Sequence, residues 1–340
     1  MKRTKEVWVD SIKAFACILV VLGHFLQSMV KSDILPDTAL YGWFNQTIYY
    51  FHVPLFFICS GYLFQKFSKV RSFAQWGSNF FKKLVSLAVP YLVFSLATYL
   101  MKTVFSDAVN KASGGLIDTL FLNPTSPYWY LYALIFIFLI TITIKNNCEA
   151  LIFIAVALAM KVVTFFVDID IYAINTVLEN EIWFVLGMLV CYVDAPARHR
   201  GSVRAWCGWA FAAVFVAMSV LAYIELPWSE EMAFLMGVIG CVSVLMISFR
   251  ITKSGRVLSA MSKYTFPVFL MHTIFAAGLR SVLLKIGITS SVIHVVSGLI
   301  ISFAGPVIVA LVLEKLKYAE LLLYPNKFIR IGAKDNGKEA

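Results

Sequence analysis

The residues of this sequence best suited to chemistry are ionisable side chains inside long apolar runs. In the first run, Lys13 and His24 stand eleven residues apart. Eleven steps of about 100° return a helix to within roughly 20° of its starting direction, so both side chains share one helix face, about 16 Å apart along the axis. Asp10 lies three residues before Lys13. A partly buried imidazole here could act as a base near neutral pH, and the lysine could hold a negatively charged group.

Both residues also have structural interpretations. Lys13 could extend its ammonium group to the membrane surface and pair there with Asp10. His24 could form a hydrogen bond between helices that holds a bundle together. The spacing alone leaves these alternatives open.

A second histidine, His52, lies in the apolar run 44–65 and is followed two residues later by Pro54. Proline removes a backbone donor, so we expect a kink beside His52. Counting residues from the ends of the two runs puts His52 and His24 at similar depths, about 9–12 Å from the outer face. His52 could instead belong to the belt of interfacial residues that flanks a membrane span.

Glu181 and His272 are the remaining candidates of this kind. Glu181 lies two residues before Trp183 at a comparable outer depth, where it could orient an imidazole or could end an acidic loop. His272 falls near the middle of its apolar run. The HExxH, GxSxG, Walker and dinucleotide-binding patterns do not occur in the sequence, so we predict no metal site and no nucleotide hydrolysis.

The composition determines which elements must carry these residues. Of 340 residues, 60% are hydrophobic and only 14% are charged, and the mean hydropathy is +0.81. A soluble domain carries roughly a quarter charged residues, so soluble and disordered classes are excluded. The net charge of +10 could suggest a nucleic-acid partner, but the basic residues lie in short loops between apolar runs, which is how membrane orientation is encoded. The sequence predicts an all-α, polytopic membrane protein that contacts lipids and does not bind nucleic acid.

The apolar runs are about as long as the hydrocarbon core of a bilayer is thick. We predict ten spans, at 11–30, 44–65, 84–102, 128–144, 149–167, 174–194, 205–224, 232–250, 263–284 and 292–313. With the N-terminus in the cytoplasm, most of the 29 Lys and Arg residues fall in the inner segments, as the positive-inside rule requires. Both termini are therefore expected in the cytoplasm. Residues 1–313 form one membrane-embedded domain, and 314–340 form a basic cytoplasmic tail.

With these residues in place, the chain resembles the membrane acyltransferase-3 superfamily, in particular its fucose O-acetylase-like branch, over residues 7–313. The hallmark is a basic residue, ten arbitrary residues and a histidine, which Lys13 and His24 match, preceded by Asp10. The segment FHVPLFFICSGYL at 51–63 is similar to a second motif of that branch. The match is completed by Lys82-Lys83 before Pro90-Tyr91, and by Ser262-Lys263-Tyr264 followed by His272.

Two positions depart from the family pattern. The family often has arginine where this chain has Lys13, which keeps the charge but loses bidentate recognition. The segment 127–131 retains Trp129 without the glutamate that many members carry nearby, so no acid is assigned there. Residues 314–340 are too few for the esterase-like domain found in some members, and a stand-alone membrane domain is expected.

The resemblance implies transfer of an acyl group, usually acetyl, from cytoplasmic acyl-CoA to a hydroxyl of an extracytoplasmic or lipid-linked carbohydrate. Acyl-CoA would be a co-substrate, and no bound cofactor is expected. His24 would be the general base and Lys13 would act with it on the donor, supported by Asp10, His52 and Glu181. Acceptor binding would fall to Trp129 and His272. A basic cluster would hold the CoA phosphates, namely Lys66, Lys69, Arg71, Lys82 and Lys83.

Two other classes stay open at this point. The chain could export or flip a polysaccharide or lipid-linked sugar without acyl transfer, although inverted repeats are not evident. It could also be the sensor part of a larger membrane assembly. The multi-pass topology favours a cell membrane, expected to be the bacterial cytoplasmic membrane. The oligomeric state, the acceptor sugar and the exact acyl group are not encoded in any pattern that we find.

Overall fold

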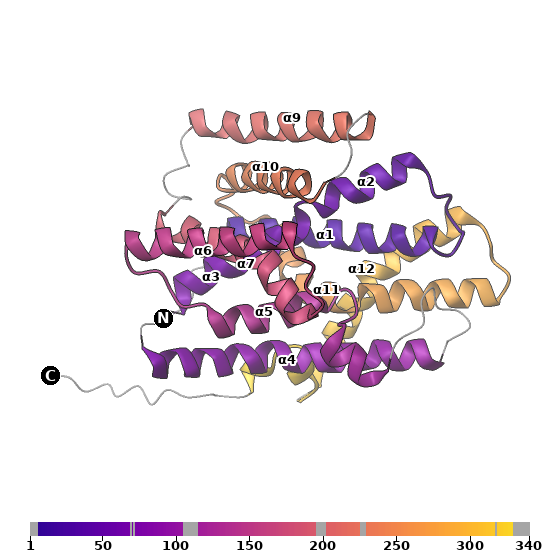
Figure 1. The fold of residues 1–340 in the computed structure, drawn as a ribbon. Coiled ribbons are helices and arrows are strands. Elements are labelled where there is room, and N and C mark those ends of the chain that lie inside the picture. Colours follow the sequence, from indigo (N-terminus) through magenta and orange to yellow (C-terminus); the bar gives the residue numbers. More distant parts are fainter. Residues whose placement is uncertain are drawn as a thin grey trace.

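The computed structural model describes residues 6–68, 70, 72–104, 115–194, 202–224, 229–316 and 318–328. Within these ranges all regular structure is helical (Figure 1). The α-helices are α1 (Val7–Val30), α2 (Ala39–Tyr49), α3 (His52–Phe67), α4 (Phe73–Val104), α5 (Trp129–Ile140), α6 (Asn147–Phe166), α7 (Tyr172–Tyr192), α9 (Ser202–Ile224), α10 (Glu230–Ser248), α11 (Arg256–Lys285) and α12 (Ser291–Lys315). A π-helical turn, η2 (Asp118–Leu122), and two 3₁₀ turns, η3 (Ala319–Leu322) and η4 (Pro325–Lys327), complete the described part.

The predicted multi-pass architecture is confirmed. Nine helical segments of the described chain are long and apolar enough to cross a membrane. The remaining predicted span, 128–144, corresponds to α5, a shorter apolar helix of 12 residues. The predicted span 44–65 consists of two helices, α2 and α3, with a break at Tyr50 and Phe51. Pro54 lies in the first turn of α3, where helical backbone N–H groups have no partner within the helix, so its ring costs no hydrogen bond.

The helices differ in how much of their surface is covered by protein. The α2–α3 segment is 72% buried over its apolar window, and α1 and α7 are each 56% buried. By contrast, only 6% of the α6 window is buried although the helix is predominantly apolar. Figure 1 shows α9 at one edge of the bundle and α4 near the opposite edge. An apolar helix without a protein cover suits contact with lipid, so α6 and α9 belong to the lipid-facing periphery.

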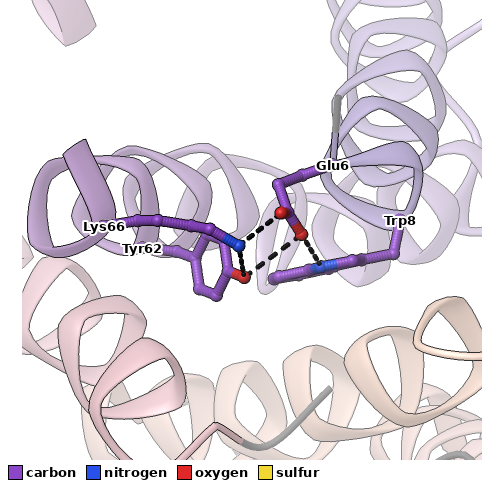
Figure 2. A network of polar contacts seen from close by, with 4 residues as sticks. All are labelled: Glu6, Trp8, Tyr62 and Lys66. Atoms are coloured by element: carbon purple, nitrogen blue, oxygen red, sulfur yellow. Dashed lines mark hydrogen bonds and ion pairs between the residues drawn. The ribbon is translucent and has the colours of Figure 1, made fainter. Parts of the chain in front are cut away.

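Contacts at the helix ends define one face of the bundle. Lys66 near the end of α3 forms an ion pair with Glu6 at the start of α1 (Figure 2), and Lys263 in α11 pairs with Glu314 in α12 at 3.0 Å. Cys17 of α1 lies 3.6 Å from the Thr265 carbonyl oxygen of α11, and farther along both helices Ser28 accepts a hydrogen bond from Arg280, so the two helices run in the same direction. By the positive-inside rule, the face that bears Glu6 and Lys66 is the inner one.

The boundary predicted at residue 313 is not the end of the packed structure. Helix α12 continues to Lys315, and the following turns fold back onto the bundle. Leu323 is 1% exposed, the rings of Tyr324 and Phe266 are 6.0 Å apart, and the Asn326 amide donates to Ser86 of α4. Part of the predicted tail is therefore packed; residues 329–340 lie outside the described ranges.

Helices α3 and α7 cross at two glycines. A Cβ atom on Gly61 would lie 1.9 Å from the carbonyl oxygen of Phe184, and one on Gly187 would lie 2.0 Å from the carbonyl oxygen of Ile58. Any larger residue would overlap the facing backbone, so glycine is required for this approach. Gly61 is therefore a packing residue, and the contact fixes the position of α7 relative to α3.

Candidate active site

A cavity of about 450 Å³ includes His24 and His52 in its wall. Residues from α1, the α2–α3 junction, the start of α5, α6, α7, α10 and α11 surround it. His24 lies six residues before the end of α1, which places the cavity in the outer part of the bundle. His24 and His52, for which similar depths were predicted, thus lie in the wall of the same cavity.

His24 is the half-buried imidazole of the cavity, and hydroxyl groups face both of its nitrogens. Its Nδ1 is 3.3 Å from the Tyr49 hydroxyl, and its Nε2 is 3.3 Å from Oγ of Ser126. The Gln27 amide, one turn farther along α1, donates to Asn45 of α2 at 3.2 Å and also lines the cavity. A ring held in this way can exchange a proton through Nε2 with a hydroxyl group placed near Ser126.

Two buried imidazoles accompany His24. His52 is 0% exposed, and its Nδ1 lies 2.6 Å from the Ile48 carbonyl oxygen. His272 is 1% exposed, and its Nδ1 lies 3.0 Å from carbonyl oxygens of Val268 and Phe269. A carbonyl oxygen only accepts, so in both rings Nδ1 donates and Nε2 carries a lone pair. The ring centroids of His272 and His24 are 5.4 Å apart.

Two tyrosines, Tyr128 just before α5 and Tyr130 in its first turn, hold the outer wall of the cavity in place. Tyr128 donates to the Leu270 carbonyl of α11 at 3.0 Å, and Tyr130 donates to the Phe56 carbonyl of α3 at 3.1 Å. Between them, the half-buried Trp129 lines the cavity together with Ser126. Because the phenol groups point to two different helices, the start of α5 is held in one orientation, and Ser126 stays beside His24.

The cavity wall, as far as the described residues define it, includes neither Lys13 nor Asp10. Both side chains are half-buried on α1, toward its inner end. The helical geometry predicted from the spacing is present, because α1 is continuous from Val7 to Val30. Lys13 lies closer to the inner face than His24, by an axial distance of about 16 Å, which is about half the thickness of the hydrocarbon core.

The predicted partnership between Glu181 and a histidine is not found in the described structure. Glu181 is 5% exposed and lies 2.9 Å from the Thr141 hydroxyl, just past the end of α5. It is absent from the cavity wall, whereas its neighbours Glu179 and Asn180 belong to it. Successive residues of a helix point about 100° apart, so Glu179 and Asn180 turn to the cavity and Glu181 turns away.

The predicted basic cluster is divided among different environments. Lys66 pairs with Glu6 and donates to the Tyr62 hydroxyl at 3.2 Å, and Glu6 also accepts from Trp8 at 3.1 Å, which closes the network of Figure 2. The ammonium group of Lys83 lies 4.8 Å from the centre of the Phe138 ring. Lys82 is exposed, and Lys69 and Arg71 lie outside the described residues.

Several residues of the site were missed in the sequence. Tyr49 and Ser126 touch His24, but a tyrosine and a serine in apolar or loop segments carry no distinctive pattern. Lys161, Glu179 and Glu230 line the cavity from three different helices. The charge of Lys161 within an apolar run was a usable signal, because ionisable residues at membrane depth commonly face a cavity.

Comparisons with known proteins identify the family of this chain. A family model described as an acyltransferase domain matches residues 6–311. The chain is similar to nodulation protein NolL of Sinorhizobium fredii, with 29% identity over 131 residues (38% of this chain and 34% of NolL). It is also similar to the inner membrane protein YcfT of Escherichia coli, with 23% identity over 226 residues (58% of this chain and 61% of YcfT).

A third relative is nodulation protein NolL of Mesorhizobium japonicum, with 24% identity over 229 residues (67% of this chain and 57% of NolL). The chain therefore spans less than two thirds of the length of each of these relatives. No solved structure matches the chain significantly. The family model covers most of the chain and all helices that form the cavity, so this multi-pass membrane protein belongs to the acyltransferase-3 family.

Proposed function

We propose that the protein transfers an acyl group, typically acetyl, from acyl-CoA at the inner face to a hydroxyl of a carbohydrate at the outer face, with His24 as the general base. The observation that carries the proposal is the half-buried imidazole of His24, whose Nε2 lies 3.3 Å from a hydroxyl oxygen inside the cavity. That oxygen belongs to Ser126, and an acceptor hydroxyl could take a similar position. Distances to a catalytic base are often slightly long before the substrate binds.

The hydrogen bonds of His24 suit this role. When Nδ1 carries the proton and donates to the Tyr49 oxygen, Nε2 presents its lone pair to the acceptor hydroxyl. The proton of that hydroxyl passes to Nε2 while its oxygen attacks the thioester carbon. The bond between that carbon and sulfur then breaks, and the thiol of CoA leaves with the proton returned by His24. Transfer is direct, and a covalent acyl-protein is not needed.

The donor would enter from the inner face. Lys82, which is exposed there, and the nearby Lys83 would attract the CoA phosphates. Lys66 would contribute less, because Glu6 already neutralises its charge. Lys13 lies between this face and His24 and would hold the donor along the gap of about 16 Å, which an extended pantetheine arm can bridge. Trp129 would contact the acceptor from the outer side of the cavity, and His272 would support the ring of His24.

Location follows from the same proposal. One relative is described as an inner membrane protein. We place this chain likewise in a bacterial cytoplasmic membrane, where acyl-CoA is present on one side and growing surface glycans on the other.

The test is His24→Ala in purified protein, assayed for transfer of radiolabelled acetyl from acetyl-CoA to a panel of oligosaccharides. Loss of a general base is expected to lower the rate by about 10²–10⁴-fold. His294→Ala is the matched control, because His294 is also buried but bonds to the Ile288 carbonyl, away from the cavity. Near-normal transfer by the His24 variant would overturn the assignment of the base. Absence of acetyl transfer and of CoA release in the wild type would instead favour an exporter.

A further inference from the structure

The outer part of the cavity carries a group of side chains that has no role in the proton transfer described above. They come from the consecutive helices α6 and α7 and from α10, which follows later in the sequence. The group consists of Lys161, Glu179, Asn180, Trp183, Glu230 and Phe234. Its position beyond His24, on the side away from the donor loops, makes it the approach for the acceptor.

Aromatic rings form one side of this approach. The centroids of Trp183 and Phe234 are 5.3 Å apart, and Phe165 lies 6.2 Å from Phe234. The ammonium group of Lys161 lies 5.0 Å from the centre of the Phe165 ring. Ligand sites commonly combine such an aromatic wall with a few polar groups that set orientation. The apolar C–H face of a sugar ring suits the wall.

The polar groups opposite the rings are mainly hydrogen-bond acceptors. Glu179 and Glu230 are carboxylates, and both lie close enough together to act on each other's charge, as does Lys161 on Glu179. One oxygen of Glu179 already accepts a bond from Asn175 at 3.1 Å. Two negative charges against one positive charge leave this wall with an excess of negative charge and of lone pairs.

His52 provides an independent indication of a ligand. It is 0% exposed and belongs to the wall of the same cavity. Its Nδ1 is bound to the Ile48 carbonyl, and its buried Nε2 has no hydrogen-bond partner among the described residues. Buried polar atoms of this kind are normally satisfied, so a bound molecule that donates a hydrogen bond would complete the site. The partner that His52 lacks is a hydrogen-bond donor, and carboxylates likewise accept from donors.

We propose that this wall is a subsite for a sugar ring without an acidic group, and that Glu179 and Glu230 exclude uronic acids and other anionic sugars. Neutral and amino sugars offer O–H or N–H donors to the carboxylates and to His52, whereas a sugar carboxylate offers only acceptors and adds negative charge. The inference rests on the proposed function in one respect, namely that the acceptor is a carbohydrate.

Three probes that share one ring test the inference: methyl glucoside, methyl glucosaminide and methyl glucuronoside. Binding to the full-length protein in detergent is measured by saturation-transfer NMR without acyl-CoA, so the result does not depend on catalysis. We expect the wild type to bind the glucoside and the glucosaminide at least about tenfold more tightly than the glucuronoside, since charged hydrogen bonds are worth roughly that much or more.

The variants locate the preference. Glu179→Gln/Glu230→Gln should lose it, through tighter binding of the glucuronoside, while Glu231→Gln should keep it because Glu231 is exposed beside the cavity and is not part of its wall. Equal binding of all three probes by the wild type, binding of none of them, or an unchanged preference in the double variant would each overturn the subsite. Selective binding without any acetyl transfer would refute the proposed function and leave the subsite standing.

Discussion

The crossing of α3 and α7 allows a sharp test of how the cavity is held. We predict that Gly61→Ala disrupts both stability and acyl transfer. The new Cβ would lie 1.9 Å from the Phe184 carbonyl oxygen, and ordinary contact begins at 3.4 Å, so the two backbones must separate by about 1.5 Å (3.4 − 1.9). Overpacking of this kind costs about 1–3 kcal/mol or more when backbone must move.

The same displacement reaches the cavity. His52 begins α3, while Asn180 and Trp183 line the cavity from α7. Moving one helix against the other by about 1.5 Å therefore separates opposite walls, and a misplacement of about 1 Å can cost roughly 10²-fold in rate. Protein that still extracts as a single species should show a lower melting temperature in detergent and a transfer rate reduced by about that factor.

Two comparisons make this prediction specific. Gly187→Ala should behave like Gly61→Ala, and the double variant should cost less than the sum, because helices that have already separated accommodate the second methyl group. Gly77→Ala in α4 is the control, since no atom lies within 4 Å of its added Cβ. It should leave stability unchanged or raise it by up to about 1 kcal/mol. Equal melting temperatures and rates for Gly61→Ala and Gly77→Ala would refute the reasoning.

Three further predictions concern the inner face and the direction of transfer. Lys82→Ala/Lys83→Ala should raise the KM for acetyl-CoA and weaken the salt dependence of that KM, while the KM for the acceptor stays unchanged. Lys285→Ala, at the outer end of α11, is the control and should leave the KM for acetyl-CoA and its salt dependence unchanged. Glu6→Gln should lower the free energy of unfolding by about 1–3 kcal/mol, because it leaves the partly buried Lys66 without its carboxylate partner. Glu314→Gln, at the more exposed pair with Lys263, should lower it by less than about 1 kcal/mol. Similar losses in the two variants would contradict the role of burial in this difference. In sealed vesicles of known orientation, acetyl-CoA should react only from the face with the 66–83 loop and the sugar only from the other; transfer with both on one side would exclude the two-sided geometry.

Much of the fold could be predicted from the sequence because bilayer insertion depends on local properties. Run length and hydropathy identify the spans one at a time, and loop charge orients them, so ten membrane segments follow without knowledge of any contact between helices. The predicted span 44–65 lies within one membrane-crossing segment, Ala39–Phe67, but the sequence did not show that this segment consists of two helices. Pro54 predicted a kink, whereas the helix is interrupted at Tyr50 and Phe51, which are both buried, and such a break depends on packing between helices.

The candidate site was predictable only within single helices. The eleven-residue spacing of Lys13 and His24 determines their common face, since the helix repeat is the same in every environment. Which side chains meet His24 from other helices was not determined in this way. Tyr49, Ser126 and His272 reach it from α2, the segment before α5 and α11, and no short-range pattern links these segments.

Thus the sequence by itself determined the membrane class, the apolar segments and the helix that carries His24, because each follows from hydropathy or the period of one helix. The orientation of the spans stays a prediction from the charge of the loops. Only the tertiary structure decided that Glu181 turns to Thr141 while Glu179 faces the cavity, and that Glu6 neutralises Lys66. These outcomes depend on the rotation and separation of neighbouring helices. Packing determines both the rotation and the separation, as the contact of Gly61 with Phe184 illustrates. These two residues are more than a hundred positions apart in the sequence.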